Sequence, residues 1–190
     1  MVIQANHPLT LQAFLALSPG EGDVTYELVD GQAIPKMSPK KNHSKLTRTL
    51  LYLLDAWSNG RGEVCPELAI TLVREGKSWV PTPDLLYIAK ERLPADWDDD
   101  GACSVPPNLA IEIISPGQTF GQLAAKARAY LDAHVLRVWV VDSKARSITV
   151  FYPDAPPQTY MGDTLLTDGL FEGLEFTAEH LFQQAGIPLD

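Results

Sequence analysis

Two acidic side chains interrupt apolar stretches that are typical of buried strands. Asp84 stands in Pro-Asp-Leu-Leu-Tyr-Ile, and Glu112 stands in Ala-Ile-Glu-Ile-Ile-Ser-Pro. A buried carboxylate is costly without a compensating partner, and two neighbouring acids repel each other unless they share a divalent cation. Lys126 follows in the next segment and could orient a water molecule or stabilise developing negative charge. These three groups are the minimum set for metal-assisted hydrolysis of a phosphodiester bond.

The alternation of residues around Glu112 predicts the direction in which this acid faces. Every second residue of a strand shares a face of the sheet. Glu112 should therefore lie with Ala110 and Ile114, and opposite Ile111 and Ile113. Glutamate is a poor strand former and is rarely fully buried, so its presence here needs a reason. A catalytic role is one such reason, and a structural salt bridge is the other.

The remaining candidates also have simpler explanations. Asp84 follows Pro83 and could cap a turn, and Lys126 taken alone would be an ordinary solvated helix residue. The position of Lys126 gives it weight, because its helix starts just past the Glu112 strand and must fold back over it. Glu27, in Tyr-Glu-Leu-Val-Asp-Gly, is a further acid inside a predicted strand. It could join the site or be an edge-strand charge.

A basic stretch lies between the Glu27 and Asp84 segments. Residues 35–48 contain four lysines, one arginine and no acid, although the whole chain has 15 lysines and arginines, 24 acids and a net charge of −9. Such an acidic chain argues against a broad nucleic-acid-binding surface, because such a surface needs clustered cations. A nuclease is still compatible with this composition, since a metal ion and a local basic patch can supply positive charge where the phosphate binds. His43 could also be an exposed histidine without function. The expected nucleic-acid-binding residues are Lys40, Lys41, His43, Lys45 and Arg48.

Other chemistries and other compartments have less support. Cys65 and Cys103 form no metal-spaced pair, and the chain has no Gly-x-Ser-x-Gly, phosphate loop or His-Glu-x-x-His. The N-terminus does not resemble a secretory signal, and no apolar stretch approaches the ~20 residues that cross a bilayer. We therefore expect a cytoplasmic protein with reduced thiols and no membrane partner.

The elements that position these groups are placed from hydrophobic periodicity and turn signals. Helices are predicted over 8–17, 38–58, 118–133 and 177–184. Strands are predicted over 24–29, 32–37, 63–72, 82–88, 108–115, 136–141, 147–152 and 158–166.

This order of elements predicts an α/β or α+β protein with helices packed on a mixed sheet. Strand 108–115, the following helix and strand 136–141 form a crossover unit, so those two strands should be parallel. We see no repeat and no linker long enough to divide the chain. The expectation is one domain over residues 1–190, with its core at about 8–185.

Six short stretches together resemble the Uma2 family, also called DUF820, of restriction-endonuclease-like proteins in the PD-(D/E)XK nuclease superfamily. They run in family order over roughly residues 8–185. The stretches are Tyr26-Glu-Leu-Val-Asp-Gly31, Ser38-Pro39 with His43, Pro83-Asp84, Glu112-Ile-Ile-Ser-Pro116, Lys126 with Tyr130, and Val138-Trp-Val-Val-Asp142.

The resemblance implies a restriction-endonuclease-like core and assigns roles to the candidate residues. Asp84 and Glu112 would be metal ligands, and Glu27 would be an additional acid at the site. The superfamily lysine normally comes two residues after the glutamate, where this chain has Ile114. In this family a lysine from the following helix substitutes, and it corresponds to Lys126.

One further position departs from the family pattern. The family commonly has an acid one turn before the lysine, and this chain has Gln122 there. The loss of that acid could weaken a hydrogen bond that orients Lys126.

The resemblance and the residues together predict a Mg²⁺- or Mn²⁺-dependent endonuclease that hydrolyses phosphodiester bonds, with DNA as the expected substrate. Asp84, Glu112 and the backbone carbonyl of Ile113 would hold the ion, and Lys126 would position or deprotonate the attacking water. The alternative is a catalytically silent nuclease fold that serves as a binding or interaction module. The acidic composition and Gln122 favour that alternative. A homodimer is expected by analogy with nucleases that cut both strands.

Overall fold

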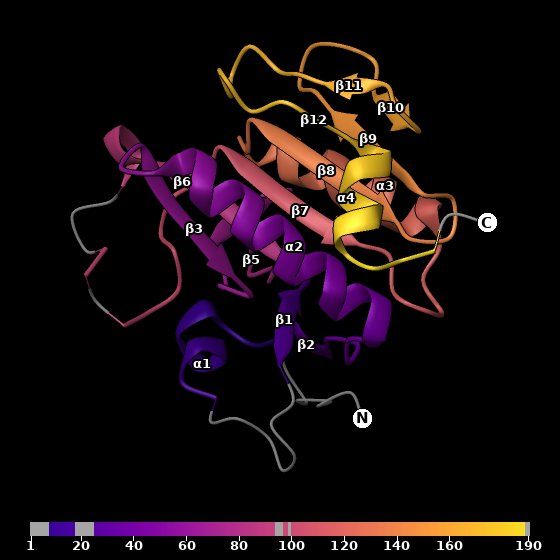
Figure 1. Cartoon of the computed structure of the whole chain (residues 1–190). Helices are drawn as coiled ribbons and strands as arrows, with labels where there is room; N and C mark the ends of the chain where they lie inside the picture. Colours follow the sequence, from indigo (N-terminus) through magenta and orange to yellow (C-terminus); the bar gives the residue numbers. More distant parts are fainter. Residues whose placement is uncertain (1–7, 18–24, 94–96, 99, 189–190) are drawn as a thin grey trace.

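A six-stranded mixed sheet forms the centre of the molecule (Figure 1). Its strands, in order across the sheet, are β10 (Gln158–Met161), β9 (Ser147–Phe151), β8 (Arg137–Asp142), β7 (Leu109–Ile113), β6 (Leu85–Ala89) and β3 (Gly62–Pro66). The computed structural model describes residues 8–17, 25–93, 97–98 and 100–188. Strands β7 and β8 run parallel, and the other neighbouring strands of this sheet are antiparallel.

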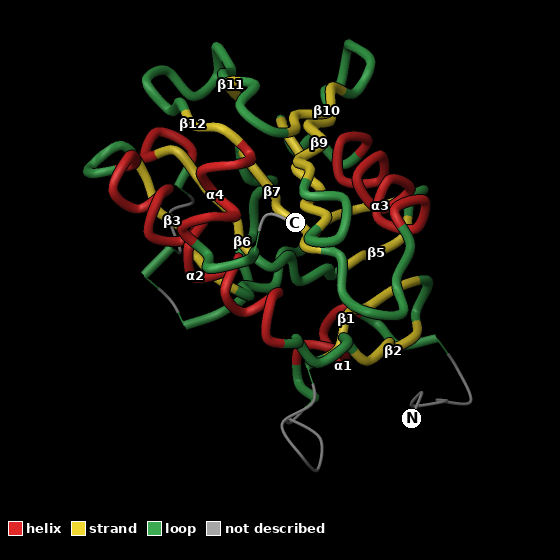
Figure 2. The backbone as a smooth tube through the Cα atoms, turned by 45° about the vertical axis from the view of Figure 1, so that its right-hand side comes forward, coloured by secondary structure: helices red, strands yellow, loops and turns green. Residues whose placement is uncertain are grey.

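Helices cover both faces of this sheet. Helices α2 (Lys41–Ser58) and α4 (Ala178–Gln184) pack on one face, and α3 (Phe120–Asp132) packs on the other (Figure 2). Because α3 connects the parallel strands β7 and β8, the predicted crossover unit is confirmed. The predicted class, a mixed sheet with helices packed on it, is confirmed as well.

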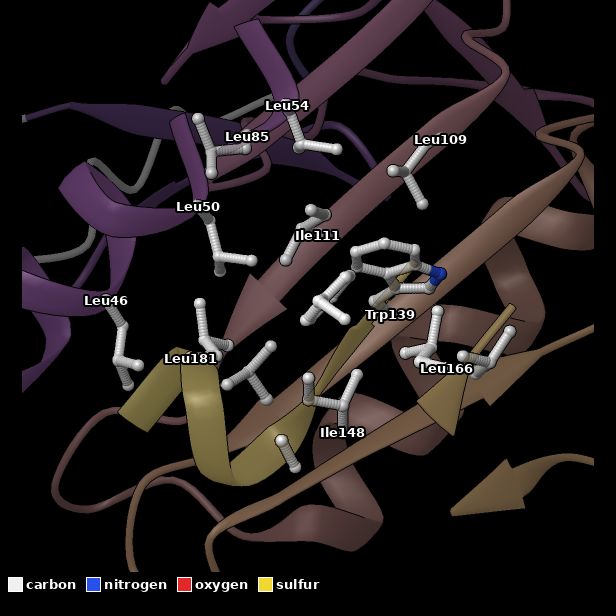
Figure 3. Close-up of a cluster of buried hydrophobic side chains, with 14 of the residues drawn as sticks. Leu46, Leu50, Leu54, Leu85, Leu109, Ile111, Trp139, Ile148, Leu166 and Leu181 are labelled. Carbon is white, nitrogen blue, oxygen red and sulfur yellow. The ribbon is translucent and has the colours of Figure 1, made fainter. Parts of the chain in front are cut away.

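The face under α2 and α4 holds a continuous apolar core. Leu46, Leu50 and Leu54 follow one another at helical spacing along α2 and point toward β6 and β7 (Figure 3). Trp139 of β8 is fully buried in the same cluster, and Leu181 of α4 joins it. A single apolar stripe of this kind fixes a helix on a sheet. It therefore also fixes the first turn of α2, which carries one of the candidate residues.

The N-terminal hairpin brings another candidate residue toward the sheet. Strands β1 (Tyr26–Val29) and β2 (Gln32–Pro35) meet at Asp30 and Gly31, whose φ angles of 51° and 77° are both left-handed. This conformation is the one that tight hairpins favour. The backbone of Leu28 exchanges two hydrogen bonds of 3.0 Å with Val80. The predicted hairpin is confirmed, although Val24, its expected first residue, lies outside the described residues.

Several boundaries differ from the prediction for local reasons. The strand expected over 63–72 ends at Pro66, and a separate hairpin follows, β4 (Leu72–Arg74) with β5 (Lys77–Trp79). The strand expected over 158–166 divides at Gly162, whose φ is 57°, into β10 and β11 (Leu165–Leu166). The remaining elements are α1 (Leu11–Leu15), the 3-10 turn η1 (Lys90–Arg92) and β12 (Phe176–Thr177).

None of the helices in the described part of the chain combines the length and the apolarity that crossing a membrane requires.

Candidate active site

The register of β6 and β7 brings Asp84 next to Glu112. Leu85 pairs with Ile111 in this antiparallel ladder, and Asp84 precedes Leu85 just as Glu112 follows Ile111. Asp84 N donates a 3.0 Å hydrogen bond to Ile111 O. Both acids are buried, with exposures of 2% for Asp84 and 4% for Glu112. The two acids therefore come from adjacent strands, and neither carboxylate is stabilised mainly by solvent.

Three groups stabilise the negative charge of the buried Asp84 carboxylate. Lys36 Nζ lies 2.9 Å from Oδ1, and His43 Nε2 lies 2.9 Å from Oδ2. Ile113 N donates a 2.7 Å hydrogen bond to the same Oδ2. Burial alone would raise the pKa of Asp84, but the His43 hydrogen bond, the Lys36 charge and the Ile113 amide outweigh it and lower this pKa. Asp84 is therefore held as a carboxylate.

Glu112 has the opposite electrostatic balance. Burial raises the pKa of Glu112 to about 7, and the charges of Asp84 and Glu27 add to that effect against the opposing charge of Lys126. Lys126 Nζ lies 2.9 Å from Oε1, and Tyr130 OH donates a 2.8 Å hydrogen bond to that oxygen. Lys126 and Tyr130 are four residues apart on α3, so one helical face presents both groups to Glu112.

Lys126 joins Glu112 to Glu27. Its Nζ lies 2.7 Å from Glu27 Oε1, which also accepts a 2.9 Å hydrogen bond from Thr82 N. Burial alone would lower the pKa of Lys126, but the charges of Glu112 and Glu27 outweigh burial and raise it. Lys126 therefore stays an ammonium ion and can donate hydrogen bonds. A proton-accepting role for Lys126 is unfavourable in this arrangement.

The structure brings four residues proposed from the sequence to one site, namely Glu27, Asp84, Glu112 and Lys126. The predicted face of Glu112 is confirmed. Ala110 and Ile114 pack with the α3-side cluster, and Ile111 and Ile113 pack with the opposite core. The catalytic and metal-binding roles of these residues stay predictions.

The basic stretch is divided between the site and the surface. His43 is buried against Asp84, so it does not lie on the surface where the sequence analysis placed it. Lys45 is half-buried, and its Nζ donates a 2.8 Å hydrogen bond to the carbonyl of Gly186. Lys40, Lys41 and Arg48 are exposed. We therefore assign His43 to the candidate site and keep the exposed cations as the possible contact surface.

Gln122 has a structural role at the start of α3. Its Oε1 accepts a 2.8 Å hydrogen bond from Thr119 N, while Gln122 N donates to Thr119 Oγ1 at 3.3 Å. This reciprocal pair is a capping box, which stabilises the beginning of a helix. Lys126 is held instead by Glu27 and Glu112. The absence of an acid at Gln122 therefore leaves the orientation of Lys126 intact.

Sequence reasoning missed Lys36 as part of the site. It follows β2 and belongs to the basic stretch, where it looked like one surface cation among five. Its ammonium also lies 3.6 Å from Glu67, and its side chain is 16% exposed. Burial alone would lower the pKa of Lys36, but the nearby acids, Asp84 first among them, outweigh burial and raise it. The one sequence signal that could have assigned Lys36 to the site was its position directly after the predicted hairpin.

The donor set of the two acids is compatible with a hard divalent cation. Asp84 and Glu112 offer carboxylate oxygens, and Mg²⁺ commonly binds through one or two carboxylates while it keeps several waters. Within the described residues, no group of three or more histidine, cysteine or acidic side chains is arranged to hold a metal. Any ion here would thus depend on these two acids, backbone oxygen and water. The carbonyl of Ile113 as a third ligand stays a prediction.

Glu112 is expected to make folding stability depend on pH. Its folded-state pKa of about 7 lies above the ordinary value of 4.5. The folded state therefore binds the proton more tightly, and this contribution is complete below pH 4.5 and is lost as pH rises toward 7. Glu112→Gln removes that dependence. Between pH 4.5 and 8, the stability of the variant relative to the wild type should rise by up to about 3 kcal/mol.

Urea unfolding of both proteins at several pH values measures this difference. A difference that stays constant over the range would contradict the raised pKa of Glu112.

Comparisons with known proteins agree with this architecture. The model of the family Uma2, described as "Putative restriction endonuclease", matches residues 11–179. A solved structure from Anabaena variabilis ATCC 29413, described as "a putative nuclease belonging to DUF820", is similar with a TM-score of 0.79. The two chains are 22% identical over 94% of this chain and 99% of that chain. At this identity the likeness shows the fold alone. The comparison with curated proteins found no match.

Proposed function

We propose that this chain, which belongs to the Uma2 family, is a metal-dependent endonuclease that hydrolyses phosphodiester bonds in DNA. One observation carries the proposal. Glu112 comes from a strand beside Asp84, and Lys126 Nζ lies 2.9 Å from its carboxylate. Two acids can hold a divalent cation, and a lysine beside them can stabilise charge that develops on the phosphate, which suits metal-assisted hydrolysis of a phosphodiester bond.

Asp84 and Glu112 would hold a Mg²⁺ or Mn²⁺ ion together with the carbonyl of Ile113. When bound, the ion would supply positive charge for the phosphate and the leaving oxygen. Asp84 is suited to this role because its lowered pKa keeps it charged. Glu112 is half-protonated near pH 7, given its pKa of about 7, so its deprotonation should accompany cation binding.

Lys126 would act as a hydrogen-bond donor. Its raised pKa keeps the ammonium charged, so it can orient the attacking water or stabilise charge that develops on the phosphate. Glu27 would be a positioning residue, because its carboxylate lies 2.7 Å from Lys126 Nζ and is itself held by Thr82 N. Tyr130 would fix the carboxylate of Glu112 from the same helix.

Lys36 and His43 would keep Asp84 oriented before the ion arrives. Lys36 contacts Oδ1 and His43 contacts Oδ2, so the carboxylate is ordered on both sides. The exposed cations Lys40 and Lys41 lie at the same end of α2 as His43, and the exposed Arg48 lies further along this helix. These three residues would attract the DNA backbone. A single domain that works as a homodimer would place two such sites on the two strands.

A catalytically silent module is the second candidate. The observation that favours it is that both acids already have cationic partners, Lys36 for Asp84 and Lys126 for Glu112. A purely structural ion-pair network would show the same contacts. The two candidates differ in whether a divalent cation binds the folded protein.

Metal titration and plasmid nicking together separate the two functions. If the site is active, Mg²⁺ or Mn²⁺ should raise the melting temperature, because the ion binds the folded state preferentially. The wild type should nick supercoiled plasmid in the same buffers, and Glu112→Gln should lose both effects. A protein that neither gains stability from either cation nor nicks DNA would be a silent module.

A further inference from the structure

We propose that Arg74 and Arg128 form a clamp that binds a backbone phosphate of the substrate beside the phosphate that is cut. This inference rests on the proposed nuclease function and adds the position from which the nucleic acid enters. It assigns a substrate-binding role to two residues of which one, Arg74, lies in a hairpin that the sequence analysis did not predict.

The clamp belongs to a cleft that opens on the candidate site. The cleft has a volume of about 390 Å³ and lies between the β4–β5 hairpin and α3. Figure 2 shows β5 and α3 on the same side of the molecule. Glu27 and Lys126 both line this cleft, and their side chains are 14% and 21% exposed. A phosphate that enters here would meet Lys126, whose Nζ lies 2.9 Å from Glu112 Oε1.

The two arginines come from opposite walls of the cleft. Arg74 ends β4, next to a tight turn in which Glu75 and Gly76 have left-handed φ angles of 50° and 76°. Arg128 is exposed on α3, two residues beyond Lys126. Among the described residues, neither guanidinium takes part in an ion pair. A guanidinium without a protein partner presents a fork of donors that matches a phosphate.

The aromatic residue of the cleft argues for recognition of the backbone rather than of bases. Trp79 lines the cleft but is 2% exposed, and its ring packs against Tyr130 with centroids 4.9 Å apart. Base stacking needs an accessible aromatic face, which Trp79 does not offer. The accessible polar groups of the cleft thus suit a phosphate, and we expect its contribution to binding to be independent of sequence.

Two acids that line the cleft allow a second prediction, in which a mutation changes DNA affinity in the opposite direction to the arginine variants. Glu75 and Asp132 are exposed lining residues, and they weaken the attraction of the cleft for an anion. Asp132→Asn should therefore bind DNA more tightly than the wild type, while Arg74→Ala and Arg128→Ala should bind it more weakly. A general effect of surface mutation would not produce both signs.

The experiment measures binding of a fluorescein-labelled DNA of about 20 nucleotides, single-stranded and as a duplex, by anisotropy in EDTA at several salt concentrations. Each arginine variant should lose about three- to tenfold in affinity, and its salt slope should fall by about 0.7 on the single strand and about 0.9 on the duplex, the value for one lost phosphate contact. Lys90→Ala is the matched control, because Lys90 is exposed and follows the end of β6 that is opposite Asp84. A Lys41→Ala, Arg48→Ala double variant tests the competing surface on α2.

The outcomes separate the clamp from the nuclease function. Weaker binding by both arginine variants, tighter binding by Asp132→Asn and no change in Lys90→Ala would support the clamp, even if the wild type cuts nothing. A wild type that nicks DNA while only the α2 double variant weakens binding would overturn the clamp and leave the nuclease. A wild type that binds neither DNA form would overturn the clamp, and the nicking assay would then decide the nuclease function on its own.

Discussion

Replacing Lys126 by alanine is expected to lower plasmid nicking by a factor of about 10² to 10³, the usual effect of removing a donor that acts on transition-state charge. The lysine is the cation that contacts Glu112 at 2.9 Å and Glu27 at 2.7 Å, and its raised pKa keeps it charged. Cation binding should survive, since the carboxylates stay in place. Mg²⁺ should stabilise the variant as much as the wild type or more, because Glu112 loses the ammonium that competes with the ion.

Two further variants serve as controls for misfolding and for contaminating nuclease. Lys126→Gln keeps a neutral donor and should retain more activity than Lys126→Ala, and near-ultraviolet circular dichroism should show that both are folded at the assay temperature. Glu112→Gln, purified in parallel, reports any contaminating nuclease. Equal nicking by all three proteins would expose a contaminating nuclease. Equal nicking by wild type and Lys126→Ala, with none by Glu112→Gln, would show that Lys126 takes no part in the reaction.

The parts of the fold that could be predicted from the sequence are those determined by neighbours along the chain. Alternation in the strand around Glu112 predicted its face. Hydrophobic periodicity predicted a helix over 38–58, and in the structure Leu46, Leu50 and Leu54 of α2 pack on the sheet. The crossover between β7 and β8 followed from the order of elements. These patterns depend only on residues that are close in the sequence, so they can be interpreted without knowledge of distant contacts.

The partners of the acids depend on contacts that no local pattern contains. Lys36 and Asp84 are far apart in the chain, and the same holds for His43 and Asp84. Composition made Lys36 and His43 look like surface residues, because a basic stretch is normally solvated. Burial of His43 follows from the packing of α2, which turns its first turn toward the start of β6.

The β4–β5 hairpin was not predicted from the sequence, for a different reason. Its strands have three residues each, too short for a periodic signal, and the turn residues Glu75 and Gly76 were the one cue. The strand predicted over 63–72 ended at the first residue of β4, and no element was predicted over residues 73–81. Because Arg74 lies in this hairpin, the missed element also concealed one wall of the cleft.

Asp84→Asn is expected to destabilise the metal-free protein by about 3 to 5 kcal/mol, the usual cost of removing one partner from a buried ion pair. The carboxylate accepts from His43 Nε2 and from Ile113 N through one oxygen, and its other oxygen contacts Lys36 Nζ. An amide can replace one oxygen, but its NH₂ group then faces a donor. Asp84→Asn should also abolish nicking.

The effect of pH distinguishes Asp84 from Glu112. The pKa of Asp84 is lowered below 3.8 in the folded state, so its stabilising contribution is present above that pH and is lost as pH falls through the folded-state value. The cost of Asp84→Asn should therefore stay constant from pH 5 to 8, the range in which the benefit of Glu112→Gln grows. Urea unfolding in EDTA at pH 5, 6.5 and 8 measures both variants against the wild type. If Asp84→Asn is as stable as the wild type at pH 8, then Lys36 and His43 do not hold this carboxylate, and the site is not pre-ordered for an ion.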